Sequence, residues 1–223
     1  TTLVHVVDKA TKLEAIFDRI ELVDTRFEVL KRDAEIELLK GKLAAMDRGD
    51  PAAVPVLERR FRERLAELED DRNHLRCCNV GGEFMDSAAQ DRVRRIAAHR
   101  WVGPDGQERD FLSEDEVQNL CISRGTLNPK DRTLIEEHVA LTLQMLNTLP
   151  WPKHLRNVPE YAGSHHEKLD GGGYHRGLRD QELPTPARII CLADVFEALT
   201  APDRPYKPGK PLSEVLNILG RMV

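Results

Sequence analysis

The sequence has 223 residues, of which 40% are hydrophobic and 32% charged, and its formal net charge is −5 at pH 7. This composition is typical of a soluble globular protein, and the negative charge argues against a nucleic-acid polymer or an anionic membrane as the partner. No apolar run in the sequence approaches the roughly 20 residues that span a bilayer, so we expect no membrane segment and a cytoplasmic location.

A long helical hairpin is predicted in the first third of the chain. From Lys12 to about Asp47, apolar residues recur at alternating steps of three and four, which is the a/d pattern of a coiled-coil-like helix. These positions are Leu13, Ile16, Ile20, Val23, Phe27, Leu30, Ala34 and Leu38. After a break at 47–51, a second stripe follows with Leu57, Phe61, Leu65, Leu68 and Leu75. We expect the two stripes to bury each other, although the first could instead form a homodimer seam.

Shorter elements are predicted in the middle of the chain. Residues 84–99 have the pattern of an amphipathic helix containing Val93 and Ile96. The residues Pro104-Asp105-Gly106 strongly favour a turn, and the segments on either side of them could form two short strands. The Ser113 to Glu116 segment is a capping box that begins a short helix through Leu120.

The next helix carries a histidine on its apolar stripe. Asn128-Pro129 supplies an N-cap and a proline at the first helical position, and the helix is expected to reach about Leu149. His138 falls on one stripe with Leu134, Leu141 and Met145. From this pattern alone it is either a core histidine with a hydrogen-bond partner or a metal ligand.

Two adjacent histidines follow in a short helix that Pro159 should open and Gly171 should end. Neighbouring side chains on a helix point about 100° apart. His165 and His166 could therefore serve two neighbouring ions, or one ion and a substrate.

The last long helix is expected from Thr185 to about Thr200 and is apolar on all sides, so burial nearly all round is predicted. Asp194 lies in its middle, where an unpaired carboxylate would be costly. A metal ion would satisfy it, and a salt bridge to Arg188 or another basic residue is the alternative. His138, His165, His166 and Asp194 together form a mixed imidazole and carboxylate set, which suits iron, manganese or zinc.

The segment 165–178 contains His-His-Glu followed by a glycine-rich loop. Three further motifs follow it in the sequence. These are Ala187-Arg188-Ile189, Ala193 to Thr200, and Arg204-Pro205-Tyr206-Lys207. Together they closely resemble the HD-GYP family, bacterial metal-dependent phosphohydrolases that act on cyclic dinucleotides, chiefly cyclic di-GMP.

The resemblance implies an all-α fold, an HD-type helical bundle, here with a long antiparallel helical-hairpin insertion and a small β-hairpin. Residues 1–13 would follow the family's His-Asp dyad, 14–124 would be the insertion, and 125–223 the carboxyl-terminal part of the domain. The sequence contains no His-Asp dipeptide, so we expect the chain to begin just downstream of the dyad. It would then lack the dyad's aspartate, which bridges the ions in the family, and the following lysine, which assists with phosphate, so the catalytic residues are unknown.

The resemblance also implies roles for individual residues. It makes His138, His165, His166 and Asp194 metal ligands, in a complete domain that holds two or three ions, most often iron or manganese. It assigns substrate binding to Tyr174, Arg204 and Lys207, and Asp170 is expected to orient a ligand histidine.

One position departs from the family pattern, because His175 stands where the family has proline.

The leading prediction is hydrolysis of a cyclic dinucleotide. The alternatives are a non-catalytic receptor for such a ligand and a protein-interaction module that dimerises through the hairpin.

Overall fold

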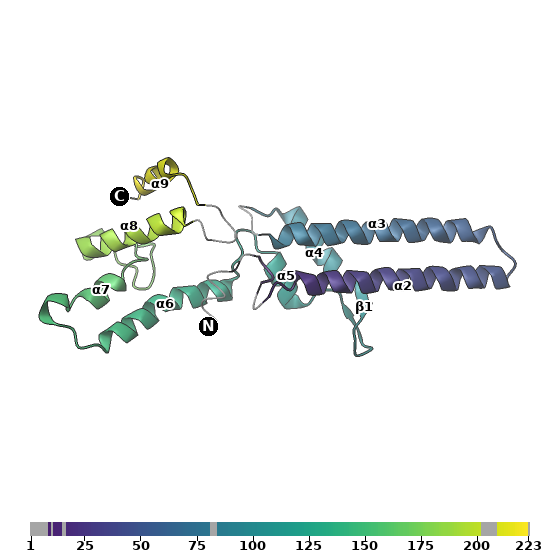
Figure 1. Cartoon of the computed structure of the whole chain (residues 1–223), viewed down its shortest axis with the longest axis horizontal. Helices are drawn as coiled ribbons and strands as arrows, with labels where there is room; N and C mark the ends of the chain where they lie inside the picture. The colour runs from purple at the N-terminus through teal and green to yellow at the C-terminus, as the bar shows by residue number, and fades with distance from the viewer. Residues whose placement is uncertain (1–8, 10, 15–16, 81–83, 202–208, 223) are drawn as a thin grey trace. The chain divides into compact units, whose positions relative to one another are not determined.

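The computed structural model describes residues 9, 11–14, 17–80, 84–201 and 209–222. These residues are mostly helical with one small two-stranded sheet (Figure 1), which confirms the all-α class. They belong to two compact units, which we call the hairpin unit (Lys9–Asn128) and the histidine unit (Pro129–Val223). In the part of the chain that is described, no helix is both long and apolar enough to cross a membrane.

Two long antiparallel helices, α2 (Ile20–Asp47) and α3 (Ala53–Asn79), form the hairpin (Figure 1). Val23, Phe27 and Leu30 of α2 are buried in one core with Leu68 and Leu75 of α3. The predicted hairpin is therefore confirmed. Because α3 of the same chain covers this stripe of α2, the stripe is not free to serve as the dimer seam that the sequence suggested.

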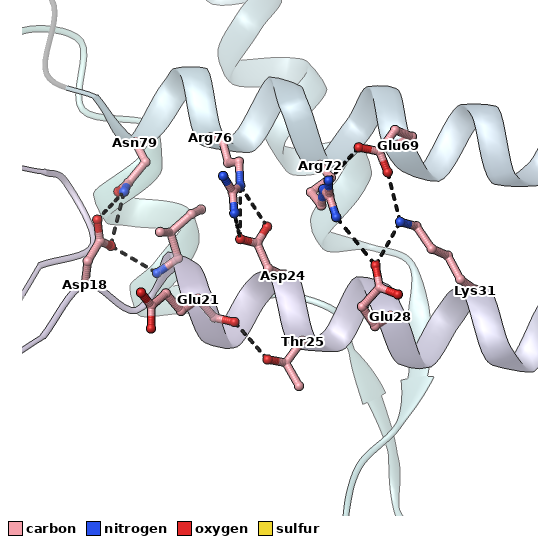
Figure 2. Close-up of polar contacts among 11 residues, drawn as sticks. Asp18, Glu21, Asp24, Thr25, Glu28, Lys31, Glu69, Arg72, Arg76 and Asn79 are labelled. Carbon is pink, nitrogen blue, oxygen red and sulfur yellow. Dashed lines mark hydrogen bonds and ion pairs between the residues drawn. The ribbon is translucent and has the colours of Figure 1, made fainter.

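Charged side chains connect the two helices along one side of the hairpin (Figure 2). Arg76 on α3 donates from Nε to Asp24 on α2 at 3.0 Å. The ammonium group of Lys31 lies 2.8 Å from both Glu28 and Glu69. Such partly exposed pairs contribute little stability individually, so we regard them mainly as contacts that fix the register of α2 against α3.

The first helix begins later than the sequence pattern predicted, at Ile20 instead of Lys12. The Asp18 carboxylate accepts from the Ile20 amide at 3.0 Å and from the Asn79 side chain at 2.9 Å. Asn79 in turn accepts from the Leu13 amide at 2.8 Å. Leu13 is still fully buried, but it reaches the core from a turn beside the end of α3, where the Lys12 amide donates to the Asn79 carbonyl oxygen at 2.8 Å. The side chains of Asp18 and Asn79 thus compete successfully with helix formation before Ile20.

The rest of the hairpin unit packs against the base of the hairpin. It contains α4 (Ser87–Ala97), β1 (Arg100–Val102), β2 (Glu108–Asp110) and α5 (Glu114–Leu120). The strands pair antiparallel around the predicted turn, and the predicted Ser113 capping box is present. The rings of Phe27 and Phe111 lie 4.5 Å apart, and the Arg26 guanidinium makes two 2.8 Å contacts with Glu116. These contacts join α2 to the segments around α5.

The histidine unit contains α6 (Pro129–Asn147), a 3-10 turn (Lys153–Leu155), α7 (Val158–Ala162), a second 3-10 turn (Asp180–Glu182), α8 (Thr185–Thr200) and α9 (Leu212–Leu219). Helix α7 contacts both α6 and α8, and α8 also contacts α9. The prediction that α8 is buried nearly all round is wrong for the described residues, since Ile189 remains 60% exposed and Ala187 is its one buried residue. The described neighbours of α8 cover one side of it.

Candidate metal centre

Three histidines of the histidine unit converge at the contact between α6 and the segment after α7. His138 lies near the middle of α6, whereas His165 and His166 follow α7, which ends at Ala162. The two adjacent histidines are therefore in a turn and not in a helix, contrary to the prediction. Each of the three offers a ring nitrogen, and these nitrogens all lie within 4.8 Å of one another.

The backbone fixes the tautomers of two of these rings. His138 Nδ1 contacts the carbonyl oxygen of Ile135, and His165 Nδ1 lies 2.6 Å from that of Ala162. A carbonyl oxygen can only accept, so both Nδ1 atoms carry a hydrogen, and in the neutral rings both Nε2 atoms then present a lone pair. Carbonyl partners of this kind orient metal-binding histidines in other proteins.

The two lone pairs point at each other, because His138 Nε2 and His165 Nε2 are 3.1 Å apart. Two neutral acceptors at this distance repel unless a cation lies beside both. Nitrogen ligands about 2.1 Å from one ion are separated by about 3.0 to 3.4 Å, depending on the coordination geometry. The residues present therefore fit a transition-metal ion.

His166 completes the cluster and is close to the predicted carboxylate ligand. Its ring centroid is 4.1 Å from that of His165, and its Nδ1 lies 3.6 Å from Asp194 Oδ2. Burial, helped by the neighbouring His165, lowers the pKa of His166 to about 4, despite the opposing effect of Asp194. The imidazole is consequently neutral near pH 7, as a metal ligand must be.

Asp194 is 40% exposed, not deeply buried as the sequence suggested. The alternative of a salt bridge to Arg188 does not occur among the described residues, since Arg188 instead contacts Asp180 at 2.6 Å. The Asp194 carboxylate is therefore available beside His166.

The glycine-rich loop is fastened to the histidines by Glu167. This side chain is 1% exposed, and its two oxygens accept from the amides of Arg176 and Leu178, each at 2.8 Å. Gly173 lies so near the backbone that an added Cβ would be 2.4 Å from the Cα of Glu167. The histidine turn and the loop therefore behave as one packed unit.

Tyr174 of this loop lies against the cluster, with its ring centroid 4.7 Å from that of His166. Burial and the nearby carboxylates of Glu136 and Asp194 raise the pKa of Tyr174 to about 12. Its hydroxyl therefore keeps its proton at neutral pH and can donate a hydrogen bond.

The other predicted site residues are Arg204, Lys207 and Asp170. Arg204 and Lys207 lie outside the described residues. Asp170 accepts from the Gly172 amide at 2.8 Å, and in the described part of the chain its carboxylate contacts no histidine ring. Its observed role is to shape the loop, which differs from the predicted orientation of a ligand.

Glu167 and Arg176 are two residues of the site to which the sequence pattern gave no role. Arg176 donates to the Ser164 hydroxyl at 2.8 Å, so both residues connect the loop to the segment after α7. The only signal in the sequence was an acidic residue placed between two histidines and three glycines.

Comparison with known proteins identifies relatives of this chain. Residues 115–223 match the family model described as HD domain. The cyclic di-GMP phosphodiesterase response regulator RpfG of Xanthomonas campestris pv. campestris is 46% identical over 182 residues, which cover 73% of this chain and 47% of that protein. A cyclic di-GMP phosphodiesterase of Thermotoga maritima is 36% identical over 175 residues, covering 71% of this chain and 47% of that protein.

A third relative is the 3′3′-cGAMP-specific phosphodiesterase 1 of Vibrio cholerae, which is 44% identical over 98 residues, covering 43% of this chain and 21% of that protein. The chain thus spans less than half the length of each of these three relatives.

Proposed function

Residues 115–223 of this chain belong to the HD domain family, and we propose that the chain is part of a phosphohydrolase of the HD-GYP type. Its substrate is a cyclic dinucleotide, cyclic di-GMP, in bacterial signal transduction. The observation that carries the proposal is the 3.1 Å approach of the His138 and His165 lone pairs beside the Tyr174 loop. The names of the relatives support the choice of substrate.

We assign the metal-binding role to His138, His165, His166 and Asp194. Three imidazoles and one carboxylate favour iron or manganese over magnesium or calcium. We propose two or three ions in a complete domain. The chemistry of such a centre, when loaded, is Lewis-acid polarisation of a phosphodiester and activation of a water molecule.

The other residues would bind and orient the substrate. Tyr174 presents a protonated hydroxyl next to His166 and can donate to a phosphate oxygen or a base edge. Arg204 and Lys207 remain proposed phosphate ligands because of their charge and hydrogen-bonding groups. Hydrolysis forms a bond from the water oxygen to phosphorus, breaks the bond from phosphorus to the 3′ oxygen, and transfers the proton of the water to that oxygen. The product is the linear dinucleotide.

We also keep three sequence predictions as proposals. Residues 14–124 are an insertion between residues 1–13 and 125–223 of the domain, which is supported by the hairpin unit's own hydrophobic core. The protein acts in the cytoplasm, where cyclic dinucleotide signalling takes place. It forms a homodimer through the hairpin, but by a face of α2 other than the one that α3 covers.

A receptor that binds the nucleotide without cleaving it is the second candidate. It is favoured by His175, which replaces the proline of the family's motif directly after Tyr174. Proline would restrict the backbone there, whereas histidine adds a titratable group and does not fix φ. This change leaves the metal-binding residues intact but alters the loop that would hold the substrate.

The two candidates are separated by turnover and binding measured on the same protein. We expect the complete domain that contains this chain, reconstituted anaerobically with Fe²⁺ or Mn²⁺, to convert cyclic di-GMP to the linear dinucleotide. His166→Ala should abolish turnover, whereas His154→Ala, which removes an exposed histidine outside the cluster, should leave it unchanged. Thermal stabilisation by cyclic di-GMP without any product would contradict the enzyme and support the receptor.

A further inference from the structure

Helix α2 carries a second apolar stripe on the side facing away from α3. Ile36, Leu39, Leu43 and Met46 are 47%, 52%, 63% and 72% exposed, respectively. At about 100° per residue these four side chains fall within an arc of about 80°. That arc is roughly opposite the one containing Phe27, which points into the core. We call these four residues the outer stripe.

The spacing of the outer stripe is that of a coiled-coil seam. The steps between its members are three, four and three residues, so Ile36 and Leu43 take a positions and Leu39 and Met46 take d positions. In parallel coiled coils, isoleucine at a followed by leucine at d, as in Ile36 and Leu39, favours two strands. Adjacent large apolar side chains exposed on a surface usually mark an interaction site.

The charged residues beside the outer stripe favour one orientation of a second α2 helix over the other. Glu35 and Lys42 flank it on one side, and Lys40 and Asp47 on the other. In a parallel, in-register pair of α2 helices, Glu35 faces Lys40 of the second copy and Lys42 faces Asp47 of the second copy. Each contact occurs twice by symmetry, so the flanks of the stripe are complementary to themselves.

In an antiparallel pair of α2 helices that overlap along the whole stripe, like charges face each other instead. Such a pair places Lys40 opposite Lys40 of the second copy, and Lys42 opposite Lys42, and like charges facing each other across an interface are unfavourable. Within one chain, Lys42 contacts Glu58 at 2.6 Å, whereas Glu35, Lys40 and Asp47 take part in no ion pair with the other described residues. The latter three remain available to a partner.

We propose that the outer stripe binds a second copy of this chain, with the two α2 helices parallel and in register about a two-fold axis. Such a contact is closed and self-complementary. It runs about 16 Å along the helix, which is short for a coiled coil, so the dimer dissociates on dilution. The surface lies entirely in the hairpin unit, and the proposal does not depend on the function of the histidine unit.

Sedimentation equilibrium over a range of concentrations tests the surface. The wild-type chain should pass from monomer to dimer as its concentration rises. Leu43→Glu should weaken the dimer at least tenfold. Ala44→Glu, which adds the same charge at the next, exposed position but off the stripe, should dimerise as the wild type does. A wild-type chain that is monomeric throughout, or a Leu43→Glu variant that dimerises normally, would overturn the proposal.

A charge exchange tests the orientation. Glu35→Lys and Lys40→Glu should each weaken the dimer by placing like charges opposite each other. The double variant should restore it, because in the parallel arrangement residue 35 faces residue 40 of the second copy. Circular dichroism should show the same helix content in all variants. If the double variant is weaker than either single variant, the parallel arrangement is wrong.

Discussion

The Nε2 atoms of His138 and His165 lie 3.1 Å apart, although both rings have already committed their Nδ1 hydrogens to backbone carbonyls. The two residues come from segments separated by 27 positions in the sequence. Hydrogen bonds to the backbone thus orient both lone pairs toward one place before any ligand binds. This arrangement is the basis for the proposed metal centre and for its dependence on the glycine-rich loop.

Glu167 should keep the glycine-rich loop in its folded conformation. In Glu167→Gln, one side-chain oxygen is replaced by an NH₂ group that faces a backbone N–H. Hydrogen bonds to a charged acceptor contribute about 1.5 to 3 kcal/mol each, so the amides of Arg176 and Leu178 should exchange at least about tenfold faster with deuterium. Glu160→Gln, at an exposed position, is the control. Unchanged exchange of these two amides in Glu167→Gln would show that Glu167 does not hold the loop.

Gly173 should tolerate no side chain. An alanine Cβ would lie 2.4 Å from the Cα of Glu167, and this backbone cannot move without shifting the histidines. We expect Gly173→Ala to lower the free energy of unfolding of the histidine unit by more than about 2 kcal/mol, measured by urea denaturation. The matched variant in the same loop is Gly172→Ala, whose nearest neighbour is the Asp170 side chain at 3.1 Å. Equal destabilisation by the two variants would contradict the close packing.

The ion pair between Arg26 and Glu116 should give the hairpin unit a specific sensitivity to acid. Burial tends to raise the pKa of Glu116, but hydrogen bonds from Arg26 and from the Ser113 amide outweigh it and hold this pKa below the ordinary value. The stabilisation is therefore complete above about pH 4.3, the usual pKa of glutamate in an unfolded chain, and is lost as the pH falls through the lower folded pKa.

Glu116→Gln should remove this acid-dependent part. At pH 7 the variant should be less stable by about 3 kcal/mol, since it leaves the partly buried Arg26 without its charged partner. The difference from the wild type should shrink below pH 4. Glu114→Gln, an exposed change in the same helix, should alter neither value. A Glu116→Gln difference that stays constant from pH 7 to pH 3 would contradict the assignment.

The heptad pattern predicted the hairpin correctly but could not show which faces of α2 are free. Val23, Phe27 and Leu30 form one stripe, and a second stripe containing Leu39 and Leu43 runs along the far side of the same helix. Both stripes have coiled-coil spacing, so periodicity alone does not identify the one that α3 covers. The choice depends on contacts of α3 and α5, which are distant in sequence.

The motifs located all three histidines of the cluster, but the local backbone at two of them was predicted incorrectly. Helix α7 ends at Ala162, and the next residue, Gly163, lies directly against Leu143 of α6, where an added Cβ would be 2.5 Å from that side chain. This contact joins segments 20 residues apart and leaves no trace in the local pattern. The position of Asp194 was similarly misjudged, because the apolar composition of α8 gives no measure of its actual coverage.

The amount of metal bound per chain is the most direct test of the proposed metal centre. The chain should be reconstituted anaerobically with Fe²⁺ or Mn²⁺, freed of unbound ions and measured by inductively coupled plasma mass spectrometry. We expect at least one tightly bound ion per wild-type chain, a loss of it in His165→Ala, and full retention in His154→Ala. A wild-type chain that retains no metal, or a His165→Ala variant that retains as much as the wild type, would contradict the proposed centre.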